Sequence, residues 1–441
     1  MGVQTFMWIA ENTLVEVHLA KDELLERILS PANMNIAYKK VVSNGGSAGV
    51  DGMSCDELLP YLREHKDALI TSLLSGRYRP KAVRRVEIPK DNGKKRLLGI
   101  PTVVDRLIQQ SIAQVLSPIY ERQFSARSYG FRPRRGAHET LKQVRRDVDT
   151  GNKYAVSIDL ERFFDTVSHS KLIEILSRTI KDGRVISLIH KYLNSGVMIG
   201  GSFVPSKEGT PQGGPLSPLL SNVMLNEMDK ELERRGHPFV LYADDSLILC
   251  KTKRAANRVS SSIITFLEQK LLLKVNREKT KVGYIGRMKY LGYSFYVMRG
   301  KCRMCVHPES YAKMKSNLKR LTSRSNGWGY ERRKRELAMF IRGWVQYYRL
   351  ADMKGNLKSI DEWLRRRVRM CIWKCWKRVR TRVNNLVKCG IDKYRAWQWG
   401  NSSKKYWRIA KSPILQRAIS NDALKRSGYL FLSEYYSKVV S

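Results

Sequence analysis

The chain has 441 residues, 42% of them hydrophobic, and a formal net charge of +42. This length predicts two or three domains, and this charge predicts a polyanionic partner, either nucleic acid or an anionic membrane surface. No apolar run approaches the roughly 20 residues that span a bilayer, and the first ten residues lack the basic flank of a signal peptide, so the sequence excludes a membrane-spanning protein and predicts a soluble, cytoplasmic one.

The charge is concentrated in the last third of the chain. Residues 301–441 contain 35 Lys and Arg against 9 Asp and Glu, together with eight of the nine Trp. Cations interleaved with aromatic rings suit phosphate contacts and base stacking better than they suit lipid. We therefore expect this part of the chain to bind nucleic acid.

The first 150 residues are interpreted as an N-terminal extension, several helices and a basic hairpin. Residues 1–20 show little pattern. Helical periodicity follows in three segments, 22–28, 35–42 and 56–74. Residues 83–89 and 95–101 are predicted strands joined through Asp91-Asn92-Gly93, because Asn-Gly is a strong hairpin signal. A further helix is expected over residues 105–116.

The middle of the chain alternates apolar runs with turn residues. Tyr154-Ala155-Val156-Ser157-Ile158 is a predicted strand that ends at Asp159, and a helix is expected from about Lys171. Gly209-Thr210-Pro211-Gln212-Gly213-Gly214 is a predicted loop, in which adjacent glycines let the backbone approach a ligand closely. A helix follows, with Ser217 as the expected N-cap and Pro218 as its first residue.

Residues 239–250 place two adjacent carboxylates, Asp244 and Asp245, between two short apolar runs, which is the pattern of a buried hairpin with a charged turn. Two like charges at the tip of an apolar hairpin are costly unless a cation neutralises them, and a hard divalent ion is the simplest candidate. A solvated turn is the ordinary alternative, because Asp is common in turns.

After this hairpin the chain becomes mainly helical. A helix to about Leu272 and a short strand pair around residues 290–295 complete an α+β domain that reaches about residue 300, and from residue 308 the pattern is helical and basic. The odd number of cysteines, seven, favours free thiols. Cys302, Cys305 and His307 lack a fourth ligand nearby, so no zinc site is predicted.

Three acids and two cations fit the chemistry of nucleotide joining, in which two divalent ions about 4 Å apart activate a 3′ hydroxyl and neutralise the phosphate. If the strand that ends at Asp159 lies beside the hairpin with Asp244 and Asp245, three carboxylates converge as magnesium ligands. Lys90 and Arg96 flank the Asn-Gly turn, where they can hold a triphosphate. Each residue alone also fits an ordinary explanation, a helix-capping Asp or a solvated basic hairpin, but their joint occurrence favours the catalytic one.

These residues lie in ordered blocks that resemble those of bacterial group II intron reverse transcriptases and maturases, specifically the compact, group IIC-like kind that lacks an endonuclease. The blocks are Arg84-Arg85-Val86-Glu87-Ile88-Pro89-Lys90, residues 99–106, Ser128-Tyr129-Gly130-Phe131-Arg132-Pro133, residues 158–165 and 209–218, Tyr242-Ala243-Asp244-Asp245, residues 274–281, and Tyr290-Leu291-Gly292-Tyr293. The resemblance covers the chain from about residue 22 nearly to the end.

The resemblance implies an α+β right-hand polymerase that follows the N-terminal extension of residues 1–20. Fingers and palm would occupy residues 21–300, with the catalytic Asp residues on an antiparallel sheet. An α-helical thumb or maturase (X) domain would occupy residues 301–380, and a small basic DNA-binding region residues 381–441. Trp344 and Tyr348 are expected to be buried in the thumb.

The resemblance also implies roles for single residues. Asp159 and Asp244, assisted by Asp245, would be catalytic and would bind two Mg²⁺ ions, with Mn²⁺ as a substitute. Phe164 would be the steric gate that excludes a 2′-hydroxyl, whereas Phe163 is better explained as core. The other expected nucleotide-binding residues are Lys90, Arg96, Leu160, Gln212 and Ala243. The residues expected to contact nucleic acid are Arg84, Arg85, Arg132, Arg365, Arg366, Arg369, Lys374 and Lys377.

The leading hypothesis is an RNA-directed DNA polymerase that copies its intron RNA from a DNA primer, using deoxynucleoside triphosphates, during retrohoming into target DNA, and that also promotes splicing. The sequence lacks the His, Asn and paired Cys of a His-Asn-His endonuclease, and the resemblance implies priming from a nascent strand at a replication fork and a ribonucleoprotein associated with the nucleoid. Two alternatives stay open. The three acids disfavour a splicing cofactor without polymerase activity, and the long basic region after residue 300 disfavours a retron or diversity-generating polymerase.

Overall fold

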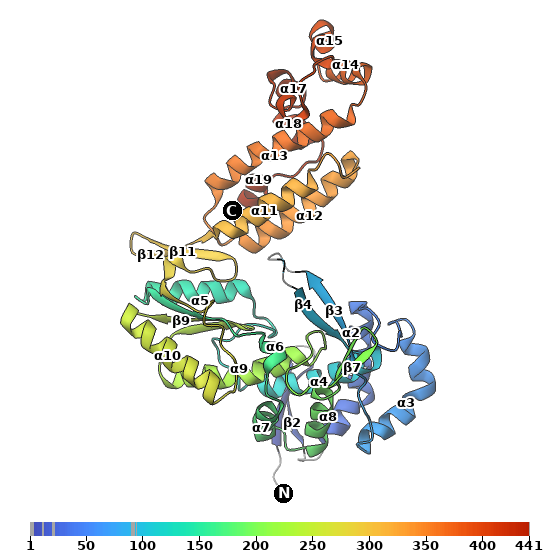
Figure 1. The fold of residues 1–441 in the computed structure, drawn as a ribbon, viewed down its shortest axis with the longest axis vertical. Coiled ribbons are helices and arrows are strands. Elements are labelled where there is room, and N and C mark those ends of the chain that lie inside the picture. Colours follow the sequence, from blue (N-terminus) through green and yellow to red (C-terminus); the bar gives the residue numbers. More distant parts are fainter. Residues whose placement is uncertain (1–3, 11–12, 20–22, 90–92, 94, 441) are drawn as a thin grey trace. The chain divides into compact units, whose positions relative to one another are not determined.

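The computed structural model describes residues 4–10, 13–19, 23–89, 93 and 95–440, and the chain divides into two compact units, Met1–Tyr284 and Ile285–Ser441 (Figure 1). The expected boundary lay near residue 300. The difference arises because strands β11 (Tyr293–Met298) and β12 (Lys301–Val306) bond to the helical unit. The Tyr293 hydroxyl donates to the carbonyl of Tyr347, and the Asp352 amide donates to the carbonyl of Met304 at 2.8 Å.

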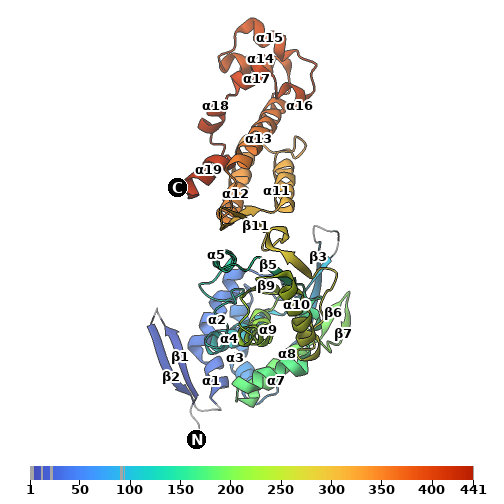
Figure 2. The ribbon, with the colours of Figure 1, turned by 90° about the vertical axis from the view of Figure 1, so that its left-hand side faces the viewer.

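The first unit contains a four-stranded antiparallel sheet in the order β10-β5-β9-β8. Its strands are β5 (Tyr154–Ile158), β8 (Phe239–Tyr242), β9 (Asp245–Cys250) and β10 (Lys281–Tyr284). Helix α10 (Lys253–Gln269) packs against β5, β9 and β10, which explains why β9 is apolar and almost wholly buried (Figure 2). The predicted Asp-Asp hairpin is confirmed as β8 and β9.

A second four-stranded sheet has the order β4-β3-β6-β7. Its strands are β3 (Val83–Pro89), β4 (Lys95–Ile100), β6 (Val197–Ile199) and β7 (Ser202–Val204). Strands β3 and β4 are antiparallel, which confirms the predicted basic hairpin. Residues 90–92 and 94 of its turn lie outside the described residues.

Helices build the rest of the first unit. They are α1 (Leu24–Leu29), α2 (Pro31–Asn44), α3 (Leu58–Leu74), α4 (Val103–Glu121), α5 (Ala137–Asp149), α6 (Phe163–Thr166), α7 (His169–Thr179), α8 (Gly183–Leu193) and α9 (Ser217–Arg234). Helix α4 is buried along most of its length and packs against α1, α2 and α9, so it forms the centre of the core.

Residues 1–20, predicted as an N-terminal extension with little pattern, contain the antiparallel strands β1 (Gln4–Ala10) and β2 (Thr13–Leu19). One local prediction needs correction. Ser217 is not an N-cap but the first residue of α9, which Leu216 precedes as the cap residue. The Ser217 hydroxyl instead donates to the carbonyl of Pro211 at 2.6 Å, so it fastens the preceding loop to the helix.

The second unit joins the hairpin of β11 and β12 to a set of helices. They are the short 3₁₀ helix η1 (Ile285–Arg287) and α11 (Pro308–Leu321), α12 (Tyr330–Tyr348), α13 (Lys354–Cys375), α14 (Val379–Lys388), α15 (Lys393–Gly400), α16 (Tyr406–Ile409), α17 (Pro413–Ala418), α18 (Asn421–Arg426) and α19 (Leu432–Val440). No helix in the described part of the chain is long and apolar enough to cross a membrane.

A buried carboxylate fastens the last helix to α13. Asp361 accepts hydrogen bonds from the amides of Leu432 and Ser433, at 2.9 and 2.8 Å, and from the Ser433 hydroxyl at 2.6 Å. These bonds satisfy amides at the start of α19 that have no partner within the helix. Burial raises the pKa of Asp361, and the bonds from Ser433 oppose that rise.

We expect Asp361→Ala to destabilise the second unit by roughly 2–3 kcal/mol, because buried amide donors lose a charged acceptor. Hydrogen exchange of residues 431–440 measures the effect, and the neighbouring exposed residue provides the control Glu362→Ala. Equal exchange protection in both variants would contradict this role of Asp361.

Candidate active site

The pairing of β5 with β9 brings the three predicted acids to one end of the sheet. Ile158 lies opposite Ser246, and the Ser246 hydroxyl donates to the carbonyl of Ile158 at 3.3 Å. The next positions in this register are Asp159 and Asp245, and Asp244 occupies the two-residue turn that joins β8 to β9. Asp244 and Asp245 are exposed and Asp159 is half-buried, so a ligand can reach this end of the sheet.

The turn between β8 and β9 depends on a glycine from another segment. Ala243 has a φ of 56°, the left-handed conformation that tight hairpin turns require. The segment before Gly130 runs beside β8, where the Tyr129 amide donates to the carbonyl of Leu241 at 2.8 Å. A Cβ added at Gly130 would lie 2.0 Å from the nitrogen of Ala243, so only glycine allows this approach to the turn.

Residues 274–280 hold the backbone around Asp159. The Asn276 amide donates to the carbonyl of Asp159 at 2.8 Å, and the Asp159 amide donates to the Thr280 hydroxyl at 3.4 Å. Lys279 Nζ lies 3.6 Å from Asp159 Oδ1, and both side chains are more than a third exposed. An exposed ion pair of this kind contributes little stability, so a stronger cation can displace the lysine.

The three acids supply hard oxygen donors for a divalent metal ion. Within the described residues, no compact group of three or more His, Cys, Asp or Glu side chains could hold a metal ion by itself. Mg²⁺ commonly binds through one or two carboxylates and completes its coordination with water and substrate phosphates. The exposed donor set therefore fits an ion that shares its ligands with a nucleotide.

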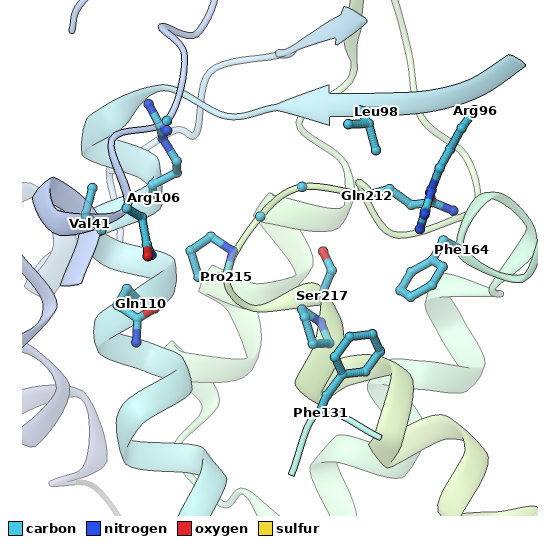
Figure 3. A pocket seen from close by; sticks show the side chains of 15 residues that line it. Val41, Arg96, Leu98, Arg106, Gln110, Phe131, Phe164, Gln212, Pro215 and Ser217 are labelled. Carbon is cyan, nitrogen blue, oxygen red and sulfur yellow. The ribbon is translucent and has the colours of Figure 1, made fainter. Parts of the chain in front are cut away.

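A pocket of about 580 Å³ is lined by residues of α2, α4, β4 and the glycine-rich loop (Figure 3). Arg96, Phe164 and Gln212 line one side of it, and Arg96 Nε donates to Gln212 Oε1 at 2.9 Å. Phe131, which follows Gly130, also lines the pocket and so connects it to the Asp244 turn. The structure therefore brings three of the predicted nucleotide-binding residues together.

The glycine-rich loop is fixed where strand β4 passes close to it. The Gly99 amide donates to the carbonyl of Gln212 at 2.8 Å, and the Thr210 amide donates to the carbonyl of Phe164 at 2.5 Å. Gly213 has a φ of 139°, and a Cβ there would lie 2.6 Å from the carbonyl oxygen of Gly99. The loop needs its glycine for close contact with β4, in addition to any contact with a ligand.

The opposite side of the pocket was not predicted. Val41, Asn44 and Gly46 line it from α2 and the loop after it, and Arg106 and Gln110 line it from α4 (Figure 3). Arg106 is buried and donates to the carbonyl of Ser47 at 2.9 Å, while its Nε has no partner among the described residues. The one signal in the sequence was that Arg106 ends the second block of the resemblance.

Two predicted nucleotide-binding residues, Leu160 and Ala243, do not line this pocket. Lys90 lies outside the described residues. Leu160 forms an isolated bridge with Val275 and so holds the segment after β5. Ala243 lies in the turn with Asp244, where its contribution is backbone conformation.

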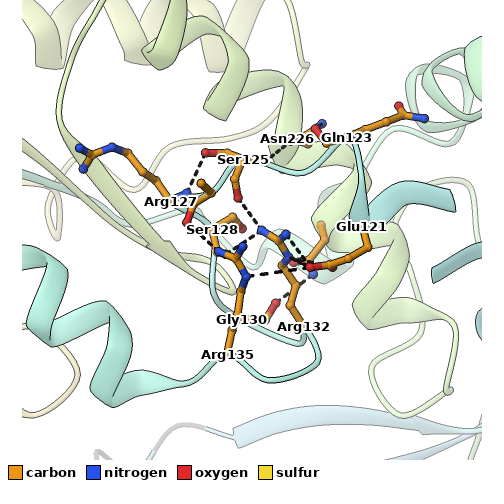
Figure 4. A network of polar contacts seen from close by, with 11 residues as sticks. Glu121, Gln123, Ser125, Arg127, Ser128, Gly130, Arg132, Arg135 and Asn226 are labelled. Atoms are coloured by element: carbon orange, nitrogen blue, oxygen red, sulfur yellow. Dashed lines mark hydrogen bonds and ion pairs between the residues drawn. The ribbon is translucent and has the colours of Figure 1, made fainter. Parts of the chain in front are cut away.

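Arg132, predicted to contact nucleic acid, bonds within the protein. Its guanidinium is buried, donates to both carboxylate oxygens of Glu121, and also donates to the carbonyls of Ser125 and Ser128 (Figure 4). The side chain therefore closes the loop that carries Gly130. Asn222 fixes the same loop from α9, donating to the carbonyl of Gly130 at 2.9 Å.

Several other arginines predicted to contact nucleic acid also bond within the protein. Arg84 donates twice to the carbonyl of Ala48, at 3.0 and 2.7 Å. Arg85 is half-buried and lines a separate pocket of about 220 Å³. Arg369 is buried and bonds to the Ile419 carbonyl at 2.7 Å. Arg365 lies 3.8 Å from a carboxylate oxygen of Glu434.

The remaining predictions concern the helical unit. Lys374 is half-buried and donates to the carbonyl of Arg324 at 2.8 Å, whereas Lys377 is exposed. Trp344 and Tyr348, expected to be buried, are only half-buried and stack with ring centroids 4.7 Å apart. Arg366 stacks on an aromatic ring of α16, as described below.

Comparison with known families gives the identity of both units. The reverse transcriptase (RNA-dependent DNA polymerase) family matches residues 88–295, and the group II intron maturase-specific domain matches residues 311–390. The chain belongs to the group II intron reverse transcriptases and maturases. The predicted α+β polymerase with a helical maturase region is thereby confirmed, and the family generally uses divalent metal ions.

Individual relatives agree with this family. Protein YkfC of Escherichia coli is 34% identical over 318 residues, which cover 63% of this chain and 82% of YkfC. The group II intron-encoded protein LtrA of Lactococcus lactis is 30% identical over 357 residues, which cover 66% of this chain and 59% of LtrA. A telomerase structure from Candida tropicalis is 17% identical, covers 51% of this chain and 55% of that chain, and has a TM-score of 0.40, too low to support an argument.

We expect Gly130→Ala to lower primer extension at least tenfold, because its Cβ would displace the backbone of Ala243 and with it Asp244. Gly136→Ala in the same segment is the matched control, since a Cβ there meets only the flexible end of Glu139, 3.1 Å away. Primer extension at matched amounts of folded protein measures the effect. Equal activity of the two variants would show that the turn does not depend on Gly130.

Proposed function

We propose that this reverse transcriptase copies group II intron RNA into DNA during retrohoming and also acts as a maturase that promotes splicing of that RNA. The observation that carries the proposal is the convergence of Asp159, Asp244 and Asp245 at one sheet end, together with a pocket that Arg96 and Gln212 line. Its substrates would be an RNA template, a DNA primer and deoxynucleoside triphosphates. Its ribonucleoprotein would act on target DNA at the nucleoid.

The acids would hold two Mg²⁺ ions, or Mn²⁺, which would activate the primer 3′ hydroxyl and neutralise charge on the transferred phosphate. Asp159 and Asp244 provide the principal oxygen ligands in this proposal, and Asp245 assists. Lys279 provides a positive charge beside Asp159, which lowers the repulsion among the acids while no substrate is bound.

The pocket would orient the incoming nucleotide through three kinds of contact. Arg96 is exposed and lies opposite Ile88 on the basic hairpin, so it can turn towards a triphosphate, with Lys90 assisting. Gln212 would contact the nucleotide once its hydrogen bond with Arg96 is broken. Phe164 is 8% exposed, and the Thr210 amide bonds to its carbonyl and so fixes its backbone, which places its ring where it can exclude a 2′-hydroxyl by steric contact.

Asp244→Asn tests the polymerase and the metal role together. The amide keeps the shape of the side chain but removes the charge, so we expect primer extension on an RNA template to fall at least 100-fold, as when a group that stabilises transition-state charge is removed. The control Asp56→Asn changes an exposed acid of the same unit, and this variant should extend primers as the wild type does. A folded wild type that binds RNA without extending primers would instead support a splicing cofactor.

Phe164→Ala tests the sugar gate. We expect incorporation of ribonucleotides relative to deoxyribonucleotides to rise at least tenfold, because the ring no longer blocks a 2′-hydroxyl. Phe164→Tyr keeps the ring and should keep the discrimination. Single-nucleotide primer extension with each sugar gives the ratio, and an unchanged ratio in Phe164→Ala would remove this role.

A further inference from the structure

The helical unit contains a pocket of about 460 Å³. Only some of the residues that line it, Arg365, Arg366 and Arg369, were predicted to contact nucleic acid. Trp363, Arg366 and Arg369 line it from α13, and Trp407, Lys411 and Asn421 line it from the segment around α16 to α18. Helix α16 packs against α13 (Figure 2). The maturase-specific match ends at residue 390, so half of this lining lies beyond that domain.

Three cations that line this pocket, Arg366, Arg369 and Lys411, form no ion pair within the described residues, whereas a fourth, Arg365, lies 3.8 Å from a carboxylate oxygen of Glu434. Arg366 donates to the carbonyl of Trp407 at 3.2 and 2.8 Å, and Arg369 donates to the carbonyl of Ile419 and to Asn421 Oδ1 at 2.7 and 2.8 Å. All of these acceptors are uncharged. In the described part of the chain, no carboxylate forms an ion pair with Arg366, Arg369 or Lys411 within 4 Å.

Burial makes the charge of Arg369 costly, whereas Arg366 is half-buried and Lys411 is exposed. Arg369 is 7% exposed, and burial lowers its pKa, with the charge of Arg365 adding to the effect. Glu362, an acid that also lines the pocket, is exposed and forms no ion pair with these side chains. Because unpaired cations in a concave, partly buried site raise the free energy of the unit, the pocket is suited to an anion.

The pocket also offers aromatic surface. The Arg366 guanidinium lies 3.8 Å from the centre of the Trp407 ring, and 37% of Trp407 is exposed. Guanidinium and indole planes are the surfaces on which unpaired bases stack, and amide side chains such as Asn421 can read a base edge. A volume of this size falls within the usual range for small-ligand sites.

We propose that this pocket binds one unpaired nucleotide of an RNA, with its phosphate on Lys411 and Arg366 and its base against Trp407. This inference rests on the RNA-binding part of the proposed function. An unpaired nucleotide fits better than a duplex, because a duplex presents its phosphates on a convex surface, whereas this site is concave. The proposal also assigns contact with RNA to part of residues 381–441, which were expected to bind DNA.

Two variants test the pocket by independent contacts. Lys411→Glu reverses an exposed charge, and Trp407→Ala removes the stacking surface. We expect each to weaken binding of a short unstructured RNA roughly tenfold, which is within the range for loss of one stacked base. Lys411→Glu should also reduce the slope of log affinity against log salt concentration by about one or more. Trp407→Ala should leave that slope unchanged.

Lys438→Glu is the matched control, because it makes the same charge change at an exposed position of α19 outside the pocket. Binding is measured with the full chain on three probes, namely the unstructured RNA, a DNA of the same sequence and an RNA duplex. Circular dichroism establishes that each variant is folded.

The proposal stands if both pocket variants lose affinity for the unstructured RNA more than for the duplex or the DNA, and the control does not. An equal loss of affinity for the duplex would show that the ligand is not an unpaired nucleotide. An equal loss of affinity for the DNA would show that the pocket does not select RNA, and no loss of affinity for any probe would show that the pocket does not bind nucleic acid. Failure of the polymerase proposal has a different signature, because wild-type protein would then bind RNA but extend no primer.

Discussion

The pairing of β5 with β9 is the constraint on which the proposed polymerase site depends. Side chains alternate between the faces of a strand, so a slip of one residue would move Asp159 to the opposite face from its partners. Buried apolar side chains on both strands, including Val156 and Leu247, oppose any slip, because their exposure to water is costly. The position of the acids is therefore determined by the core beneath them.

A buried polar network connects this sheet end to the helices. Arg132 bonds to Glu121 at the end of α4, and Asn222 of α9 bonds to Gly130, so both helices fix the loop that supports the Asp244 turn. Asp229 of α9 is fully buried nearby, and burial, with the charge of Glu233 adding to it, raises its pKa well above the ordinary value. Burial in the core disfavours the charged form of this acid, which is the main cause of the rise.

Sequence patterns identified the candidate site residues better than they identified the residues that hold them in place. Asp159, Asp244 and Asp245 were candidates because strand ends and hairpin turns are local features, Arg96 was a candidate because it flanks the Asn-Gly turn, and Gln212 followed from the resemblance. The residue type alone does not distinguish an arginine that contacts RNA from one that closes a loop, and Arg132, predicted to contact nucleic acid, bonds to Glu121 and to carbonyls of its own loop. The Arg106 side of the pocket was missed because it forms only when α2 and α4 come together.

The arginines of the two units differ in the groups that accept their hydrogen bonds. In the first, arginines commonly bond to carboxylates, as Arg127 does to Asp147 at 2.7 Å. In the second, where 35 cations face 9 acids after residue 300, Arg366, Arg367 and Arg369 bond mainly to carbonyl and hydroxyl oxygens. Hydrogen bonds to such groups fix the direction of a guanidinium but do not neutralise it, so repulsion among these side chains remains in the folded unit. A polyanion that binds only the folded form removes this repulsion and stabilises that form by mass action. RNA binding and the stability of the helical unit are therefore coupled, and the same unpaired charges that weaken the free protein favour its complex.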